Sequence, residues 1–503
     1  MTQQHPYILG VDIGTSSSKA LAFSLKGTVG AQHQIKYNTR HPQPDFSEQD
    51  PEVLLAAVTG VIRSVVEQTG SQPMCVSFSS AMHSLMAVDQ KGDPLSPLLL
   101  WSDNRSLEAA TAFKAEPDAL DFYQHTGTPV HPMSPFCKLL WWKAHDPETY
   151  RHAARFVSIK EYIFSRFFGT YLVDYSMASA TGLFDHQQLQ WYAPALERLQ
   201  LPVGKLSAPV APTHQCKGLR APYTQQTGID PAVPFIVGAG DGCLANLGTG
   251  VTQAGELAVT IGTSGAVRLF GTQPVRDPAG RIFNYLLQEG QYISGGAINN
   301  GGVLLDWYRR HFVQTPELQY EDIVTEAFGA PAGCNGLLLL PYLFGERAPM
   351  WDAQARGAFI GISNRHEKPH FARALLEGIV YSLYHSLGIM EELSGTAGPV
   401  YASGGFTRSP RWVQLLTDVF AKEVRVSGHG DASSVGAAMM GMKAMGVISD
   451  WAAAEKHLPV HRTYQPKSTQ TTVYHRNFSL YAQLYERLEP AMHTLAEWQR
   501  TNP

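Results

Sequence analysis

The sequence predicts two α/β domains, each built around a central β-sheet. First, a strand, a G-T-S turn and a second strand occur near the N-terminus and again after residue 255. Second, these strands are followed by helical segments, a pattern typical of sheets covered by helices. Third, the chain has 503 residues, of which 44% are hydrophobic and 16% charged. This length suggests two to four domains, and the composition allows large cores.

The first domain is expected to open with three strands. Tyr7–Ile13 is apolar and leads into a G-T-S turn, and Lys19–Leu25 and Ala31–Tyr37 follow it. The short turns between them contain glycine, which is typical of hairpins. An amphipathic helix is predicted at Pro51–Gln68 and a buried strand at Met74–Ser79. The pattern predicts a mixed sheet with a helix packed against it.

The same pattern begins again at the strand Gly255–Ile261, with a second strand at Ala266–Phe270. The elements predicted after them are a long helix, a strand that ends at a glycine pair, and two further helices: His370–Glu392, the strand ending at Ser403, Arg411–Phe420 and Ser433–Met445. We infer one architecture used twice, with a boundary near residues 245–255. The predicted domains are residues 1–250 and 251–460, followed by a helical extension at 461–503.

Charge and cysteine content exclude several classes of protein. The net charge is −4 and no long basic run occurs, so neither nucleic acid nor an anionic membrane is expected as a partner. No apolar run approaches the ~20 residues of a membrane span, and residues 1–14 do not resemble a signal peptide. Five widely spaced cysteines without a C-x-x-C pair indicate reduced thiols, with no zinc site or disulfide framework. We therefore expect a soluble, cytoplasmic protein.

The segment Gly10–Lys19 joins a carboxylate at a strand end to a tight turn. Gly14 allows the backbone to approach a ligand closely, and Lys19 adds a positive charge. The residues whose hydroxyls and amides can bind phosphate oxygens are Thr15, Ser16, Ser17 and Ser18. Asp12 would repel phosphate directly, so it is suited to holding Mg²⁺ through water. The alternative is an ordinary polar hairpin turn.

A second loop, Val259–Gly265, repeats this pattern without the carboxylate. Its Gly262 and Thr263 occupy the places of the glycine and first hydroxyl of the earlier loop. Two hairpins of this kind can hold a triphosphate from opposite sides. The chain has no G-x-x-x-x-G-K-[ST] motif, and the turns lead to strands, so this is not a Walker loop.

The two loops resemble those of the actin-like ATPases, and within that superfamily the chain is similar to the FGGY carbohydrate kinases over about residues 6–460. Met133–Trp141 matches the first signature of that family. Gly357–Ile362, continuing to Glu377, resembles the second, except at Leu375, where the pattern prefers a small or β-branched residue. The resemblance implies two actin-like (ribonuclease H-like) domains facing each other across a deep cleft, and it implies the use of ATP and Mg²⁺.

A second carboxylate, Asp241, lies on the glycine-flanked turn that follows the apolar run Pro234–Val237. Phosphoryl transfer needs a group that orients the attacking hydroxyl and accepts its proton, and an ordinary Asp is basic enough. The alternative role is capping of the next helix, Cys243–Leu247. FGGY kinases have their catalytic base at this place, so the resemblance implies that Asp241 is the base, contacts the substrate hydroxyl and lies near the metal.

The resemblance also implies a sugar site. FGGY sugar kinases carry a Met-His pair that contacts the sugar, here Met82 and His83, although His83 can instead be a satisfied core residue. Arg105, in a W-x-D-x-R segment, can bind a carboxylate in bidentate fashion or pair with Asp103. His131 is a further candidate because of its charge and its place.

Two loops that contain glycine pairs are expected to contact the nucleotide. Gly404-Gly405 begins a segment that resembles the adenosine loop of the family, in which Ser409 stands where many relatives have Asn. Gly302, with Asp306 one turn later, resembles the other nucleotide loop. The alternative for each pair is a plain turn. Arg347, in a loop shared by sugar kinases of several specificities, can equally form a structural pair with Glu346.

Several stretches look like bacterial gluconokinases in particular: residues 77–84, 126–135, 173–180 and 299–302. This resemblance implies phosphorylation of D-gluconate to 6-phospho-D-gluconate. Xylulose or another ketose or polyol is the alternative substrate within the same chemistry, and glycerol is disfavoured because glycerol kinases have Arg-Glu in place of Met82-His83. A non-catalytic actin-like ATP-binding protein is the alternative of another class, but it would be expected to lose Asp12 or Asp241. The sequence leaves open whether the chain forms a homodimer.

Overall fold

The computed structural model describes residues 6–313, 319–428 and 430–502, and the chain forms two compact units. The first unit comprises Met1–Ala254, Phe270–Ile293 and Asp431–Pro459. The second comprises Gly255–Leu269, Ser294–Gly430 and Val460–Pro503. The domain limits proposed from the sequence stay a prediction.

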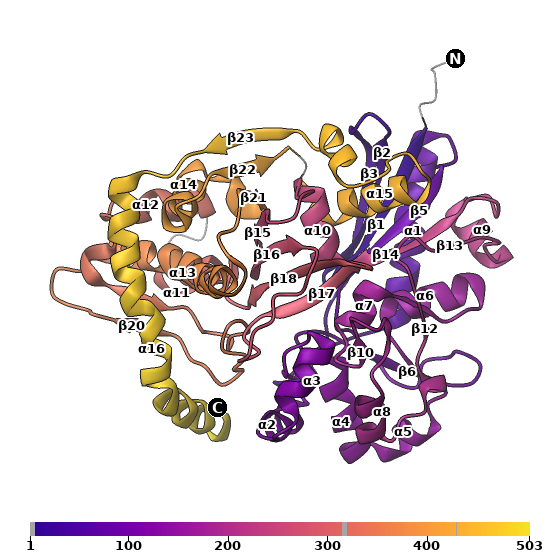
Figure 1. The fold of residues 1–503 in the computed structure, drawn as a ribbon, viewed down its shortest axis with the longest axis horizontal. Coiled ribbons are helices and arrows are strands. Elements are labelled where there is room, and N and C mark those ends of the chain that lie inside the picture. The colour runs from indigo at the N-terminus through magenta and orange to yellow at the C-terminus, as the bar shows by residue number, and fades with distance from the viewer. Residues whose placement is uncertain (1–5, 314–318, 429, 503) are drawn as a thin grey trace. The chain divides into compact units, whose positions relative to one another are not determined.

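The first unit contains a six-stranded sheet in the order β13-β14-β5-β1-β2-β3 (Figure 1). Its strands are β1 Tyr7–Ile13, β2 Ser17–Ser24, β3 Val29–Lys36, β5 Cys75–Ser80, β13 Gln215–Cys216 and β14 Phe235–Gly240. β1 runs antiparallel to β2 and parallel to β5, and β14 is parallel to β5. The other strands of this unit are β4 Glu48–Gln49, β6 Met86–Val88, β7 Leu98–Leu99, β8 Arg155–Val157, β9 Leu172–Asp174, β10 Phe184–Asp185, β11 Gln190–Trp191, β12 Ala208–Val210 and β17 Phe283–Gln288.

The helices of the first unit are α1 Pro51–Thr69, α2 Leu107–Lys114, α3 Ala119–Thr126, α4 Pro135–His145, α5 Pro147–His152, α6 Ile159–Phe168, α7 Tyr175–Ser179, α8 Ala193–Leu199, α9 Ala221–Thr227, α10 Asp241–Thr249 and α15 Ala432–Ala444. The short 3₁₀ helices are Val203–Lys205 and Ala452–His457.

Side chains alternate between the two faces of β1, and the face decides whether a residue packs against α1 or against α15. Leu9, Val11 and Ile13 belong to the apolar cluster that α1 completes. Gly10 lies on the other face, where a Cβ atom would come within 2.3 Å of the Ser434 carbonyl oxygen of α15. Asp12 follows Gly10 by two residues, so its carboxylate lies on the α15 face at the end of the strand.

The helices α10 and α15 cross in close contact because each contributes a glycine. A Cβ atom on Gly436 would lie 1.9 Å from the Leu244 carbonyl oxygen, and one on Gly248 would lie 1.8 Å from that of Ala432. Glycine is required at both positions, since backbone atoms occupy the space of a side chain. The crossing fixes the N-terminal end of α10, where Asp241 lies, beside α15.

The second unit repeats the strand order of the first, with β18-β16-β15-β21-β22-β23 in sequence across its sheet. The bounds are β15 Leu257–Ile261, β16 Gly265–Gly271, β18 Gln291–Ile298, β21 Val400–Ser403, β22 Val424–Ser427 and β23 Val460–Tyr464. β15 is antiparallel to β16 and parallel to β21, as β1 is to β2 and β5. The prediction of one architecture used twice is confirmed.

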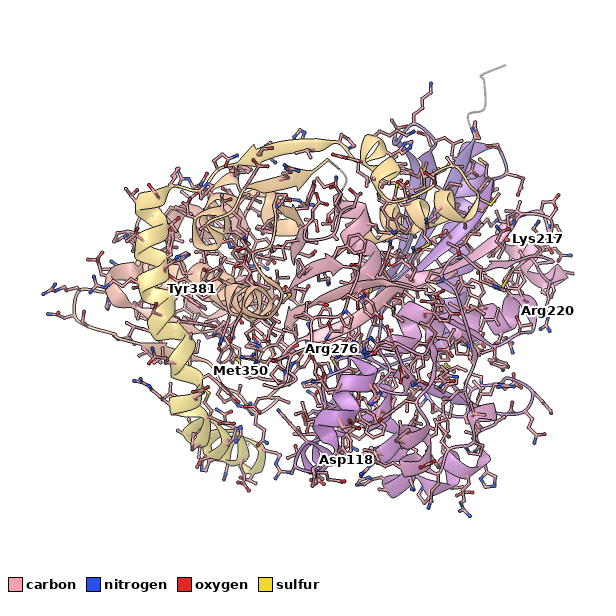
Figure 2. The ribbon with its side chains drawn as sticks, in the orientation of Figure 1. Asp118, Lys217, Arg220, Arg276, Met350 and Tyr381 are labelled. Carbon is pink, nitrogen blue, oxygen red and sulfur yellow. The ribbon has the colours of Figure 1, made fainter. Side chains whose placement is uncertain are left out.

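Helices of the second unit surround this sheet: α11 Val303–Phe312, α12 Tyr320–Ala327, α13 Lys368–Ser394, α14 Pro410–Phe420 and α16 Ser468–Thr501. Two short strands, β19 Leu338–Leu340 and β20 Ala358–Ile360, pair with each other, and 3₁₀ helices lie at Cys334–Gly336 and Gly405–Arg408. Tyr381 of α13 lies against α16 (Figure 2), with its ring centroid 5.5 Å from that of Tyr481. This contact holds the C-terminal helix on the unit.

Most elements predicted from the sequence are present. β1 spans the predicted residues, and α1, α13, α14 and α15 each lie within two residues of the predicted limits at both ends. All five cysteines are buried and reduced, as expected. Among the described residues, no helix combines the length and the apolar character that a membrane crossing requires.

Candidate active site

Asp12 is the last residue but one of β1. It is buried, 8% exposed, and its Oδ1 accepts a hydrogen bond of 2.7 Å from the Ser79 hydroxyl. Burial, followed by the neighbouring carboxylates of Asp431 and Asp241, raises the pKa of Asp12 to about 7. Asp12 therefore lies within electrostatic range of Asp241, the other aspartate predicted at the metal, and of a further one, Asp431. Close carboxylates repel one another, and a bound cation relieves that repulsion.

Asp431 is the acidic residue that sequence reasoning missed. It precedes α15, caps that helix by accepting from the Ser434 amide, and forms an ion pair of 3.1 Å with Lys19. An Asp before a helix of small residues is an N-cap signal in the sequence. No feature of the neighbouring sequence indicates that Asp431 lies beside Asp12 in the fold.

The turn after β1 is held by polar partners. Thr15 receives hydrogen bonds at its hydroxyl from the Trp101 indole, at 3.0 Å, and at its carbonyl from Gln49, at 2.6 Å. The Ser17 hydroxyl accepts from Gln34 at 2.7 Å, and Ser16 is exposed at the tip. The loop is therefore fixed on both sides, and Ser16 is its most accessible member.

Asp241 is the first residue of α10, directly after β14. The N-cap position belongs to Gly240, which makes no side-chain cap, and Asp241 Oδ1 accepts from the adjacent Gly242 amide at 2.7 Å. Asp241 therefore lies one position after the N-cap and contacts a first-turn amide, and both roles proposed from the sequence stay open. The carboxylate lies at the carboxyl end of a central strand, where ligands bind in sheets of this type.

Two contacts fix the backbone that leads to Asp241. Lys160, buried against Asp174 at 2.6 Å, donates to the Ala239 carbonyl at 3.2 Å. Met82 packs on Gly240, where a Cβ atom would lie 2.8 Å from the Met82 Cγ. The predicted sugar contact Met82 and the predicted base are therefore neighbours.

His83 follows Met82 with a φ of 65°, in the left-handed region that residues other than glycine rarely adopt. Its Nδ1 lies 2.8 Å from the Ala180 carbonyl, which only accepts, so Nδ1 carries a proton. The Tyr285 hydroxyl lies 3.3 Å from Nε2. Strained residues of this kind cluster at functional sites.

Arg105 is 6% exposed and bound by two carboxylates. Its Nη2 lies 2.6 Å from Glu48, and its Nε lies 2.8 Å from Asp103. The guanidinium also stacks on Phe46, with 3.8 Å from Cζ to the ring centroid. The pairing with Asp103 that the sequence left open is present, and Glu48 adds a partner that sequence reasoning missed. Recognition of a substrate carboxylate by Arg105 stays an untested prediction.

His131 is buried in the turn before α4. Its Nδ1 accepts from the Met133 amide at 3.2 Å, so in the neutral ring the proton resides on Nε2. The Nε2 atom can therefore donate to an oxygen acceptor. A role in substrate binding remains a prediction.

The nucleotide loops predicted in the second unit converge at the end of β15. The Gly302 amide donates to the Gly262 carbonyl at 2.7 Å, and the Val303 amide donates to that of Thr263 at 3.1 Å. Gly404 has a φ of 100°, and a Cβ atom there would lie 2.5 Å from the Ile261 carbonyl oxygen. The glycines are needed because three loops share this space.

The polar residues of these loops have protein partners. The Ser409 hydroxyl donates to Glu321 at 3.1 Å, while Asp306 accepts from the Tyr320 hydroxyl at 2.6 Å and from Arg309 at 3.2 Å. Gly405 has open space beside it, where a Cβ atom would meet nothing within 4 Å. A flat ligand can approach the backbone at such a position.

Glu346 joins the Asn299-Asn300 segment to its own loop. It is fully buried and accepts from the Asn299 amide at 2.6 Å, the Asn300 side chain at 3.2 Å and the Arg347 amide at 2.9 Å. Burial raises its pKa to about 7. Arg347 donates to the Ile298 carbonyl at 3.0 Å. These bonds hold the segment that leads into Gly301-Gly302.

Residues 7–248 match the N-terminal domain of the FGGY family of carbohydrate kinases, and residues 257–445 match its C-terminal domain. The chain belongs to this family. It is 39% identical over 508 residues to gluconokinase from Bacillus licheniformis, with 98% of each chain covered. Gluconate kinase from Lactobacillus acidophilus has a similar structure, with a TM-score of 0.92, 31% identity and coverage of 96% of this chain and 98% of that one.

A xylulose kinase from the same organism matches with a TM-score of 0.94 and 31% identity, over 97% of this chain and 100% of that one. Fold similarity therefore does not separate the two kinase activities. The kinase has the mixed α/β, two-domain fold of the family, and it is a phosphotransferase with an alcohol group as acceptor.

Proposed function

We propose that this kinase transfers the γ-phosphoryl group of ATP to the 6-hydroxyl of D-gluconate, giving 6-phospho-D-gluconate. The observation that carries the substrate assignment is the 39% identity to a gluconokinase over 98% of both chains. The chemistry is supported by the buried Asp12 and by Asp241 at its strand end.

In this proposal Asp241 accepts a hydrogen bond from the attacking hydroxyl and takes its proton as the bond to phosphorus forms. Met82, packed on Gly240, and His83 position the sugar beside it. The fixed geometry supplies most of the rate enhancement, because a loose transition state needs alignment more than strong basicity.

The carboxylate oxygens of Asp12 and Asp241 are ligands of the kind that Mg²⁺ prefers. Asp12 is a hard oxygen ligand whose charge is disfavoured by burial and by nearby carboxylates, which a divalent cation offsets. In the described part of the chain no group of three or more His, Cys, Asp or Glu residues forms a ready metal site. Mg²⁺ is usually held by one or two carboxylates and substrate phosphates, so Asp12 and Asp241 would suffice. When bound, the ion neutralises charge on the phosphates.

The proposed nucleotide contacts are those that the sequence predicts. Thr15, Ser16, Ser17 and Lys19 would contact phosphates, as would Gly262 and Thr263. Gly302, Asp306, Gly404, Gly405 and Ser409 would line the ribose and adenine. The partner is thus a small sugar acid, with ATP as the second substrate.

The test is an assay coupled to ADP release, run with gluconate, xylulose and other sugars and sugar acids. Gluconate should give the highest kcat/KM. A higher value for xylulose would replace the substrate assignment, and ATP turnover unaffected by every sugar would contradict the kinase activity.

The mechanism is tested by Asp241→Asn, which removes the proton acceptor and keeps the size of the side chain. Loss of a general base lowers kcat by about 10²–10⁴. Asp50→Asn is the matched control, because Asp50 caps α1 from an exposed position and Asn caps equally well. Near-normal kcat for the folded Asp241→Asn variant would contradict the assigned role.

A further inference from the structure

Lys138 of α4 is a buried cation that the proposed chemistry does not use. Its side chain is 0% exposed, and its Nζ lies 2.6 Å from the Leu100 carbonyl oxygen and 2.7 Å from that of His83. Burial lowers the pKa of this lysine to about 7. A lysine is rarely buried so completely, and charge-assisted bonds to carbonyls are the compensation here.

The carbonyl of His83 belongs to a residue of the sugar segment with a strained backbone. His83 has a φ of 65°, and its ring is held at Nδ1 by the Ala180 carbonyl and at Nε2 by the Tyr285 hydroxyl. The bond from Lys138 adds a third restraint at the carbonyl. A conformation of this kind persists only when its surroundings fix it.

The carbonyl of Leu100 lies in a segment that contacts the phosphate loop. Leu100 directly precedes Trp101, whose indole donates to the Thr15 hydroxyl at 3.0 Å. Lys138 therefore joins two segments of the first unit that are separate in the sequence. One carries His83, and the other contacts the turn after β1.

We propose that Lys138 is a positioning residue for the sugar site, which holds the left-handed His83 and the Leu100–Trp101 segment in one fixed arrangement. The inference rests on the proposed function, because it takes Met82-His83 as the sugar contact. Without the ammonium group, His83 relaxes toward ordinary backbone angles and its ring moves away from the sugar. ATP recognition should change less, because Gln49 also holds the phosphate loop at the Thr15 carbonyl.

The test compares Lys138→Met with Lys205→Met. Lys205 also donates to two main-chain carbonyls, those of Tyr150 and Arg151, each at 3.0 Å, but in a part of the first unit without predicted site residues. Lys138→Met should raise the KM for the sugar by about tenfold or more, since small misplacements are costly at an active site. The KM for ATP should stay within about twofold. Lys205→Met should change neither KM.

A merely structural role gives a different result. It would reduce the folded fraction, and with it kcat, while the KM for the sugar stayed at the wild-type value; that outcome would overturn the proposal. Lys138→Gln is the second variant, because its amide can still donate, and it should give an intermediate sugar KM. If neither variant folds, Lys138 is required for folding and the proposal is also wrong.

The assay uses whichever sugar the wild-type kinase prefers, and calorimetric titration of that sugar gives its Kd directly. If the wild-type protein rejects gluconate, the substrate assignment fails while the comparison of variants on the preferred sugar still decides the role of Lys138. If gluconate is accepted and Lys138→Met binds it normally, only the positioning role is refuted.

Discussion

Replacement of Gly436 by Ala tests the close crossing of α10 and α15 on which the position of Asp241 depends. An alanine Cβ would lie 1.9 Å from the Leu244 carbonyl oxygen and 2.6 Å from its carbon, both backbone atoms of α10. Neither atom can move without moving that helix. Gly388→Ala is the matched control, because this glycine is also inside a helix, and an alanine Cβ there would meet nothing within 4 Å.

The magnitude follows from two opposing effects. Alanine favours a helix over glycine by roughly 0.5–1 kcal/mol. Carbon and oxygen normally approach to no less than about 3.3 Å, so the helices must separate locally by roughly 1.4 Å at residue 436. Overpacking of this kind costs about 1–3 kcal/mol, and the backbone contact places the cost at the upper end. We expect net destabilisation of about 2 kcal/mol for Gly436→Ala and stabilisation of about 0.5–1 kcal/mol for Gly388→Ala.

Thermal unfolding and initial-rate kinetics together measure both consequences. For a unit as large as the first, 1 kcal/mol shifts the midpoint by roughly 1.5 °C, so Gly436→Ala should unfold about 3 °C below the wild type and Gly388→Ala slightly above it. At a temperature where both are folded, Gly436→Ala should also have a lower kcat, because α10 begins with Asp241. Equal midpoints for the two variants, with unchanged kcat, would refute the close crossing.

Two further substitutions test the metal site and a buried carboxylate. Asp12→Asn should lower kcat and raise the Mg²⁺ concentration that gives half-maximal turnover; an unchanged Mg²⁺ dependence would contradict its assignment as a metal ligand. The pKa of Glu346 is raised from 4.5 to about 7. Between those pH values the native state holds a proton that the unfolded state releases. The free energy of unfolding therefore falls as pH rises through this window. In urea unfolding, the difference in free energy of unfolding between Glu346→Gln and the wild type should rise by roughly 3 kcal/mol in favour of the variant between pH 4.5 and 7. A difference that does not change with pH would refute this.

The sheet frameworks of both units could be predicted because their determinants are local. A strand that ends at a G-T-S turn and a following strand identify the β1–β2 and β15–β16 hairpins directly. Asp12, Asp241 and the glycine loops were predicted for the same reason, since each lies at or soon after the end of a strand. A strand end is recognisable in a sequence, and it is also where these sheets place their ligands.

Residues that act through distant partners could not be found in this way. Asp431 is far along the chain from Asp12 and Lys19, and its position beside them depends on the crossing of α10 and α15. Lys138 appears in the sequence as one residue of a helix-forming signature, and its carbonyl partners are His83 and Leu100. Backbone carbonyls carry no sequence signal, so such contacts emerge only when the fold is known.

Arg105 shows why a charge in a suitable segment does not by itself define a role. From the sequence, carboxylate binding and pairing with Asp103 were both open, and the structure adds Glu48 as a second acid and Phe46 as a stacking surface. Both acids already bind the guanidinium, so a substrate carboxylate would have to compete with them for its donors. Recognition of a sugar acid by Arg105 therefore stays a prediction from the sequence. His131 is a second candidate, because its Nδ1 accepts from the Met133 amide and the neutral ring then carries its proton on Nε2, from which it can donate to a carboxylate oxygen.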